Sequence, residues 1–169
     1  MENQPEEPLF PEADVARLIF LTLQGVHHIH ENGIVHRDLK LANLLLSKDQ
    51  SLRIIDFGVS LVVPKDPKEY NKEIVGSLAF MAPEIFKTKG AETSYTPAVD
   101  IWAIGIIMFN LLAGASPFSG YEEDEYKHSI MNDEVNYRRT DRIMNASDKA
   151  KSLIDKLCEK DPNERLTAE

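Results

Sequence analysis

The spacing of apolar side chains predicts a long helix near the start of the chain. From Val15 to Ile29 the apolar positions recur at intervals of three and four residues, which places them on one helical face. Pro11 followed by acidic residues is a typical helix start. Asn32-Gly33 is a typical helix stop. We therefore expect a helix from about residue 11 to Glu31.

After this helix the pattern becomes shorter and less regular. Leu44–Leu46 and Leu52–Ile55 are apolar runs joined by the polar segment Ser47–Gln50, which predicts a two-stranded β-ribbon. Val59–Met81 carries two prolines and many charges with little periodicity, and we interpret it as a long loop. Long loops in compact domains are usually functional or disordered.

The second half of the chain has helical patterns. Ala98–Ala113 is apolar on all sides and predicts a buried helix, whereas Asp124–Asn132 and Ser147–Glu159 predict amphipathic helices. Ser147 is a suitable N-cap for the last of these. Thr167–Glu169 resembles the start of another helix. The expected fold class is mainly α with one small β-ribbon.

Composition and charge narrow the possible partners. The 169 residues suit one domain with 43% apolar and 28% charged residues, and the net charge of −9 argues against a nucleic-acid partner. The apolar run Ile101–Ala113 is too short to span a membrane. Met1–Phe10 lacks a signal pattern, and the single Cys158 permits no disulfide within the chain. We expect an intracellular location in the cytoplasm, with the nucleus also open.

The densest group of polar residues is His36–Asn43. Asp56-Phe57-Gly58 follows thirteen residues after Asn43, and the two predicted strands lie between the two motifs. Because a short hairpin brings its ends together, we expect the polar side chains of both motifs to converge on one spot. They are Asp38, Lys40, Asn43 and Asp56.

These residue types suit phosphoryl transfer. Asn43 and Asp56 offer the hard oxygen ligands that Mg²⁺ prefers. Lys40 offers a cation for a transferring phosphoryl group, and Asp38 offers a carboxylate that can orient a hydroxyl and take its proton. Such positioning and charge stabilisation supply most of what this reaction needs. Gly58 would let the chain turn sharply after the metal ligand.

Five motifs in fixed order resemble those of eukaryotic-type serine/threonine protein kinases. His36–Asn43 resembles the catalytic loop, and Asp56–Gly58 is similar to the family's Asp-Phe-Gly motif. Ala82-Pro83-Glu84 is similar to the Ala-Pro-Glu motif, and Asp100–Gly105 to the Asp-x-Trp-x-x-Gly that starts a buried central helix. Arg165 stands where the family places an arginine that pairs with the glutamate of Ala-Pro-Glu.

The resemblance implies a protein-kinase C-lobe over residues 9–169, preceded by a polar segment at residues 1–8. We expect a partial kinase domain, truncated at both ends, because no glycine-rich loop or strand lysine precedes Leu9. Glu12–Asp14, Asn32–His36 and Leu111–Gly114 look most like the calcium/calmodulin-dependent and calcium-dependent kinases.

The resemblance also implies ATP and Mg²⁺ as cofactors and protein serine or threonine as substrate. Asp38 would be the catalytic base, and Lys40 would contact the γ-phosphate, as is typical of the serine/threonine class. Asn43 and Asp56 would hold magnesium. Leu45 would form the floor under the adenine.

Further positions would support this site. The resemblance implies that His36 stacks on Phe57 and that Asp100 anchors the backbone of the catalytic loop. Ser77 stands where the family usually has a threonine that bonds the catalytic aspartate and lysine. Serine keeps the hydroxyl, so we expect that contact to survive.

Some positions depart from the family pattern. Arg37 would pair with a loop phosphate, but the loop from Asp56 to Glu84 holds no threonine. We hypothesise that Arg37 instead meets Glu69 or Glu73, giving activity without loop phosphorylation.

Two other departures affect the expected substrate. Leu41-Ala42 replaces the usual Pro-Glu, and Asn110 replaces a glutamate of some relatives, so a basic substrate consensus is not implied.

Three histidines, His27, His28 and His30, suggest a metal site. No cysteine or carboxylate cluster accompanies them, so we interpret them as surface or packing residues.

Two functions remain open at this point. The first is ATP-dependent phosphorylation of proteins, by a piece of an active kinase or by a lobe completed in trans. The second is a non-catalytic interaction or scaffold module. Because the family grips ATP between two lobes, this chain alone is expected to bind ATP weakly. It would expose apolar surface around Leu45 and Phe57, so a partner covering this inter-lobe face is also expected.

Overall fold

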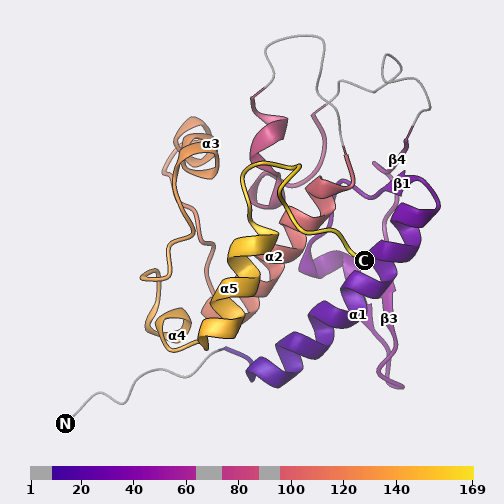
Figure 1. Ribbon diagram of the computed structural model, residues 1–169, viewed down its shortest axis with the longest axis horizontal. Helices are drawn as coiled ribbons and strands as arrows, with labels where there is room; N and C mark the ends of the chain where they lie inside the picture. The colour runs from indigo at the N-terminus through magenta and orange to yellow at the C-terminus, as the bar shows by residue number, and fades with distance from the viewer. Residues whose placement is uncertain (1–8, 64–73, 88–95) are drawn as a thin grey trace.

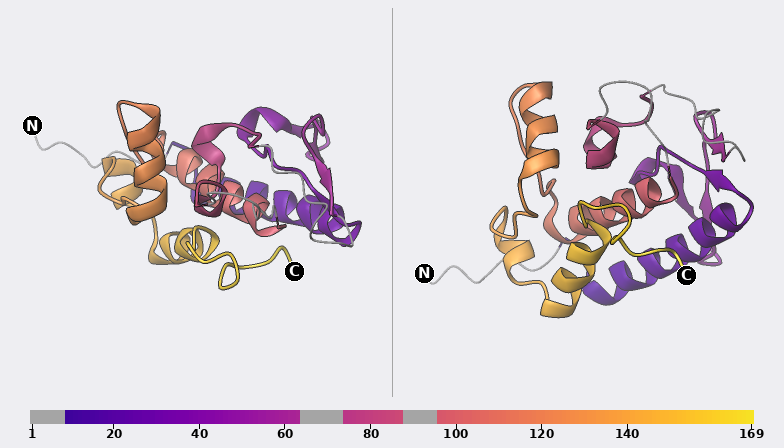
Figure 2. Two further views of the ribbon diagram at one scale, coloured as in Figure 1. Left: turned by 90° about the horizontal axis from the view of Figure 1, so that it is seen from above. Right: turned by 45° about the horizontal axis from the view of Figure 1, so that its top comes forward.

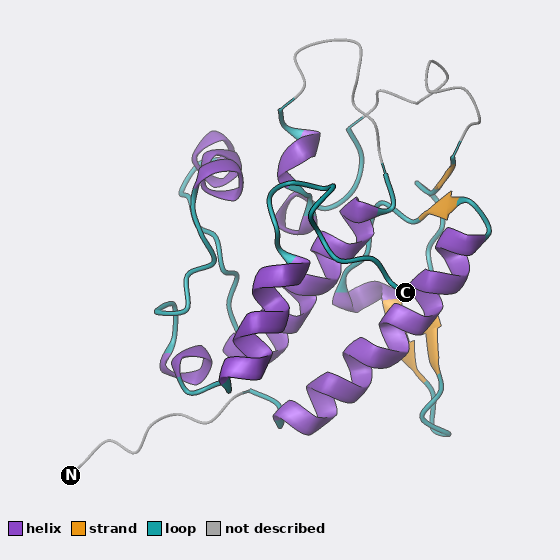
Figure 3. Ribbon diagram, in the orientation of Figure 1, coloured by secondary structure: helices purple, strands orange, loops and turns teal. Residues whose placement is uncertain are grey.

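The computed structural model describes residues 9–63, 74–87 and 96–169 as a mainly helical domain with two small antiparallel ribbons (Figures 1 and 3). This architecture confirms the expected fold class. The helices are α1 (Glu12–Glu31), α2 (Ala98–Ala113), α3 (Glu123–Asn132), α4 (Asp141–Met144) and α5 (Asp148–Leu157), with 3₁₀ turns η1 (Leu41–Asn43), η3 (Leu78–Phe80) and η4 (Pro83–Ile85). The strands are β1 (Ile34–Val35), β2 (Leu44–Leu46), β3 (Leu52–Ile54) and β4 (Leu61–Val62).

Helix α1 follows its predicted bounds. It begins directly after Pro11, which fixes the entry, and it ends where the Asn32 N–H turns back to the carbonyls of the last turn. Its buried face runs from Val15 to Val26 at helical spacing, as the sequence predicts. At its first turn the Glu12 carboxylate accepts hydrogen bonds from the backbone N–H and hydroxyl of Ser147, which ties α1 to the start of α5.

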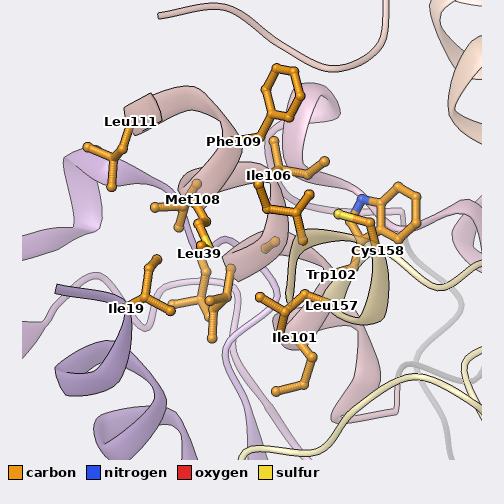
Figure 4. Close-up of a cluster of buried hydrophobic side chains, with 14 of the residues drawn as sticks. Ile19, Leu39, Ile101, Trp102, Ile106, Met108, Phe109, Leu111, Leu157 and Cys158 are labelled. Carbon is orange, nitrogen blue, oxygen red and sulfur yellow. The ribbon is translucent and has the colours of Figure 1, made fainter. Parts of the chain in front are cut away.

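Helix α2 forms the centre of the domain. It is buried almost all round, and α1, α4 and α5 pack against it. Figure 4 shows the shared core, in which Ile19 of α1, Leu157 of α5 and Leu39, which lies between β1 and η1, gather around α2 side chains. Each large aliphatic side chain buried there contributes about 1.5–3 kcal/mol. The three views agree that α1 and α3 lie on opposite sides of α2 (Figure 2).

The β-ribbon predicted from the sequence is present. Strands β2 and β3 pair antiparallel with Leu44 opposite Ile54, and β3 contacts α1. A second ribbon, β1 with β4, was not predicted, because the region that contains β4 was interpreted as loop. Strands of two residues are too short to show an alternating pattern, and this pairing joins segments that are distant in sequence.

The remaining differences concern short helical turns. Helix α4 was not predicted, and it is a single turn whose Ile143 N–H donates to the side chain of Thr140. Ser147 caps α5 as predicted, through a hydrogen bond from the Ala150 N–H. Thr167–Glu169 is not helical, contrary to the expectation. Within the described ranges, no helix has the length and apolar character needed to cross a membrane.

Candidate active site

The first turn of α2 holds the start of the segment His36–Asn43, which the resemblance assigns to the catalytic loop. Asp100 is 1% exposed, and its carboxylate accepts hydrogen bonds from the backbone N–H groups of His36 (2.9 Å) and Arg37 (3.0 Å). Arg37 has a left-handed backbone conformation with φ of 68°. Such a conformation costs a non-glycine residue about 1–2 kcal/mol. The hydrogen bonds that these N–H groups donate to Asp100 offset this strain, so the backbone arrives at Asp38 in a fixed direction.

Three polar residues, Lys40, Ser77 and Asn43, meet at Asp38. The Lys40 ammonium donates to one carboxylate oxygen of Asp38 at 2.7 Å and to the Ser77 hydroxyl at 3.0 Å. The backbone N–H of Ser77 donates to the other carboxylate oxygen at 2.8 Å. The Asn43 amide donates to the backbone carbonyl of Asp38 at 2.9 Å. The contact expected of Ser77 is therefore present with serine in place of threonine.

These contacts set the charge of Asp38. Burial raises the pKa of this carboxyl, but hydrogen bonds from Lys40 and Ser77 outweigh the burial and leave the pKa below its ordinary value. Asp38 is therefore a carboxylate at neutral pH. It can accept a hydrogen bond from a substrate hydroxyl without first losing a proton of its own.

Gly76 allows the Ser77 segment to approach the catalytic loop. Its φ is 107°, a conformation that favours glycine, and an added Cβ would collide with the Arg37 carbonyl. The close approach brings the Ser77 N–H within reach of Asp38.

The Asp-Phe-Gly motif lies at the open end of the β2–β3 ribbon. The Ile55 N–H donates to the Asn43 carbonyl at 3.0 Å, and this bond places Asp56 next to the catalytic loop. The chain then turns at Gly58, as expected, although the left-handed conformation falls at Asp56, with φ of 65°. The Asp56 carboxylate is exposed and accepts a hydrogen bond from the Gly58 N–H at 3.4 Å.

The donor set next to the ribbon fits a magnesium ion that keeps most of its water and phosphate ligands. Asn43 is 5% exposed, and its amide nitrogen donates a hydrogen bond to the Asp38 carbonyl. Its amide oxygen is therefore the atom that could coordinate the metal. Asp56 adds an exposed carboxylate. Across the described residues, no group of three or more His, Cys, Asp or Glu side chains is arranged to hold a metal. Mg²⁺ commonly binds proteins through one or two such ligands plus substrate phosphates.

The expected ring contact is present beside this site. His36 and Phe57 lie with ring centroids 4.9 Å apart and tilted by 60°, and His36 Nε2 bonds the Ile55 carbonyl. Phe57 is 43% exposed and Leu45 is 49% exposed, so both offer apolar surface at this edge. Arg37 donates from Nε to the Val59 carbonyl at 2.5 Å. Its hypothesised partners at positions 69 and 73 lie outside the described residues.

The arginine–glutamate pair joins the C-terminal region to η4. Arg165 is 4% exposed and donates to both carboxylate oxygens of Glu84, at 2.8 and 2.9 Å. Its guanidinium also lies 5.2 Å from the centre of the Trp102 ring. This pair therefore connects η4, α2 and the end of the chain, as its position in the sequence predicted.

His30 is the site-linked residue that the sequence interpretation missed. Its Nε2 lies 2.8 Å from the Asp100 carboxylate, and its side chain is 12% exposed. The available signal was its spacing, because His30 follows the buried Val26 by one helical step of four residues.

This combination of a helical domain and an Asp-Lys-Asn cluster beside a short ribbon is that of a protein-kinase C-lobe. The chain matches the protein kinase domain family over residues 2–169. The chain therefore belongs to the protein kinase domain family.

Individual relatives of the chain are also protein kinases. It is 39% identical over 162 residues to calcium-dependent protein kinase 17 of Arabidopsis thaliana, covering 94% of this chain and 29% of the relative. It is 37% identical over 166 residues to the liver/testis isoform of the phosphorylase b kinase gamma catalytic chain of Bos taurus, covering 97% and 40%. The chain thus spans less than half the length of these relatives and corresponds to the C-lobe-like part of a kinase domain.

Proposed function

We propose that this chain carries the catalytic lobe of a serine/threonine protein kinase that transfers the γ-phosphoryl group of ATP to protein hydroxyls with Mg²⁺. The observation that carries the proposal is the ionised Asp38, held at both carboxylate oxygens by Lys40 and the Ser77 N–H. A lysine two residues after this aspartate is typical of the serine/threonine class, as the sequence resemblance implied.

Each residue of the cluster has a proposed part in the reaction. Asp38 would accept the hydrogen bond of the substrate hydroxyl, align it, and take its proton. Lys40 would place its charge beside the transferring group, and the Ser77 hydroxyl would hold that lysine in place. Asn43 and Asp56 would hold the metal. Mg-ATP, when bound, would supply the phosphoryl group and neutralise its charge.

The exposed edge beside the cluster supports a second proposal about assembly. Leu45, Leu46 and Phe57 are 49%, 59% and 43% exposed, and they flank the expected nucleotide position. We propose that another lobe, from a longer form of this protein or from a partner in trans, covers this face and completes ATP binding. We also propose an intracellular location, where the single Cys158 would stay reduced.

A phosphotransfer assay tests the function. Because the isolated chain lacks the proposed covering lobe and is expected to bind ATP weakly, it is incubated with Mg²⁺, a high concentration of labelled ATP and a peptide library containing serine, threonine and tyrosine, and slow turnover is measured. Asp38→Asn is the test variant, and Asp49→Asn, an exposed site on the β2–β3 turn, is the matched control. We expect labelled serine or threonine, a loss of at least about 100-fold in Asp38→Asn, and wild-type rates in Asp49→Asn.

The other results are equally informative. Labelling that persists in Asp38→Asn would assign the signal to a contaminating kinase and contradict the proposal. Labelled tyrosine would contradict the serine/threonine assignment. Peptide binding without turnover in the wild-type chain would favour the interaction-module alternative.

A further inference from the structure

The positive charge of this acidic chain is concentrated around the turn that leads into α4. Residues 138–151 hold five Lys and Arg against two Asp, a local charge of +3, whereas the other 155 residues hold 14 Lys and Arg against 26 Asp and Glu, a charge of −12. Arg138 and Arg139 are exposed and Arg142 is partly buried. We call these three arginines the basic turn.

Hydrogen bonds fix the backbone that carries the basic turn. The Asn136 side chain accepts from the Arg138 N–H at 2.9 Å, and the Asn136 carbonyl accepts from the Arg139 N–H at 3.2 Å. The Thr140 hydroxyl donates to the Ala113 carbonyl at 3.2 Å, which fastens the turn to the end of α2. A partner that binds here would therefore need to order the arginine side chains but not the backbone, which lowers the cost of binding.

The two exposed arginines have charge available for a partner. Neither Arg138 nor Arg139 takes part in an ion pair within the part of the chain that the structure describes. A guanidinium donates two parallel hydrogen bonds to a carboxylate, so it recognises that group by shape as well as by charge. Lys151 brings a further positive charge to α4, because its ammonium donates to the Met144 carbonyl at 2.8 Å.

We propose that the basic turn is a docking surface for an acidic peptide segment of a protein partner. The charge of the rest of the chain favours a short peptide over larger polyanions. Charges more than about 8 Å apart are largely screened at physiological ionic strength, so a peptide seated on the turn interacts mainly with the arginines. A membrane surface or a nucleic-acid duplex is wider and would also meet the surrounding negative charge.

The position of the basic turn makes this docking independent of the proposed catalytic site. In both views, α4 lies at the opposite end of the domain from the two ribbons (Figures 1 and 2). A partner bound at the turn would leave the edge at Leu45 and Phe57 open. The proposal therefore does not rest on the proposed function and can be tested without turnover.

Fluorescence anisotropy with the 169-residue chain and a labelled peptide that alternates glutamate and serine tests the proposal. Arg138→Ala/Arg139→Ala is the test variant. Lys48→Ala/Lys156→Ala is the matched control, because it removes two exposed positive charges at sites away from the turn and changes the net charge equally. At physiological ionic strength we expect the Kd to rise at least about fivefold in the test variant, equivalent to about 1 kcal/mol. The control should stay within about twofold of the wild type.

Two further variants and probes sharpen the result. Arg138→Lys/Arg139→Lys keeps the charge but loses the paired donors, so its affinity should lie between those of the wild type and the alanine variant. A peptide that alternates glutamine and serine should not bind. Far-UV circular dichroism should show the same folded signal for all variants, because the substituted side chains are exposed.

Several results would overturn the proposal. Equal weakening in the test variant and the control would assign the binding to net charge alone. No wild-type binding at about 1 mM glutamate–serine peptide would also reject the site. Phosphatidylserine vesicles and duplex DNA, compared at the same concentration of anionic groups, test the other occupants. Tighter binding of either one than of the peptide would contradict the assignment to an acidic peptide.

Discussion

Replacing Arg165 should destabilise this domain more than replacing a surface arginine. The Arg165 side chain is fully buried, and Glu84, its partner, is 15% exposed at the side chain. Arg165→Met keeps much of the apolar volume against Trp102 but removes the charge. The Glu84 carboxylate then stays largely buried without its guanidinium partner.

The contacts of Arg165 set the size of the effect. Breaking a buried ion pair by removing one partner typically costs about 3–5 kcal/mol. The guanidinium also donates to the carbonyls of Ala98 (2.8 Å) and Glu159 (2.7 Å), which lose these partners. The methionine side chain recovers part of this through packing, so we expect the free energy of unfolding to fall by about 3–5 kcal/mol. Many domains have only about 5–15 kcal/mol in total.

Urea unfolding of the 169-residue chain measures this loss. Far-UV circular dichroism and the fluorescence of Trp102, the single tryptophan of the chain, provide two probes of the transition. The exposed Arg138→Met is the matched control and should change stability by less than about 0.5 kcal/mol. The double variant Arg165→Met/Glu84→Gln should be about 2 kcal/mol more stable than the sum of the single changes predicts. A loss below about 1 kcal/mol in Arg165→Met, or strict additivity, would refute the reasoning.

Three further predictions concern the core and the Asp38 carboxylate. Gly105→Ala would place a Cβ 2.5 Å from the Cys158 Sγ, so we expect urea unfolding to show a loss of about 1–3 kcal/mol that Cys158→Ala partly restores. Burial raises the pKa of Cys158 to about 12, so a thiol reagent at pH 8 should modify the native chain at least about 100-fold more slowly than the urea-unfolded chain; equal rates would contradict this. The lowered pKa of Asp38 stabilises the folded state fully above about pH 4, and this contribution is lost as the pH falls through the folded pKa. The stability advantage of the wild type over Asp38→Asn should therefore shrink between pH 7 and pH 3, and urea midpoints that diverge in acid would argue against it.

The long helices could be predicted from sequence because their signals are local. The regular spacing from Val15 onward and the stop at Asn32-Gly33 gave α1 within one residue at its start. The mostly apolar segment of α2 allowed both of its ends to be predicted. The β1–β4 ribbon and α4 escaped prediction because neither is long enough to carry a period of its own. The ribbon forms because the folded chain brings Leu61–Val62 next to Ile34–Val35, where the two segments pair.

In the candidate site, too, some contacts could be predicted from local sequence motifs and others depend on how the helices pack. Motif order placed Asp38, Lys40 and Asn43 correctly near one another, and the contact of Ser77 followed from its retained hydroxyl. The contact of His30 could not be derived in the same way, because it depends on how α1 docks against α2. The left-handed conformation at Asp56 was also not foreseen, since the sequence directs attention to the glycine two residues later.

The contacts that support the Asp38 carboxylate and the edge proposed to contact the nucleotide involve different residues of the domain. Asp38 is fixed by Lys40 and Ser77 and, through the backbone, by the buried Asp100. All of these anchors lie within the described part of this chain. The apolar edge at Leu45 and Phe57 is open instead, and it is where the resemblance places the adenine. A lobe that covers this edge would therefore act mainly on nucleotide affinity, because Lys40, Ser77 and Asp100 already hold the geometry around Asp38.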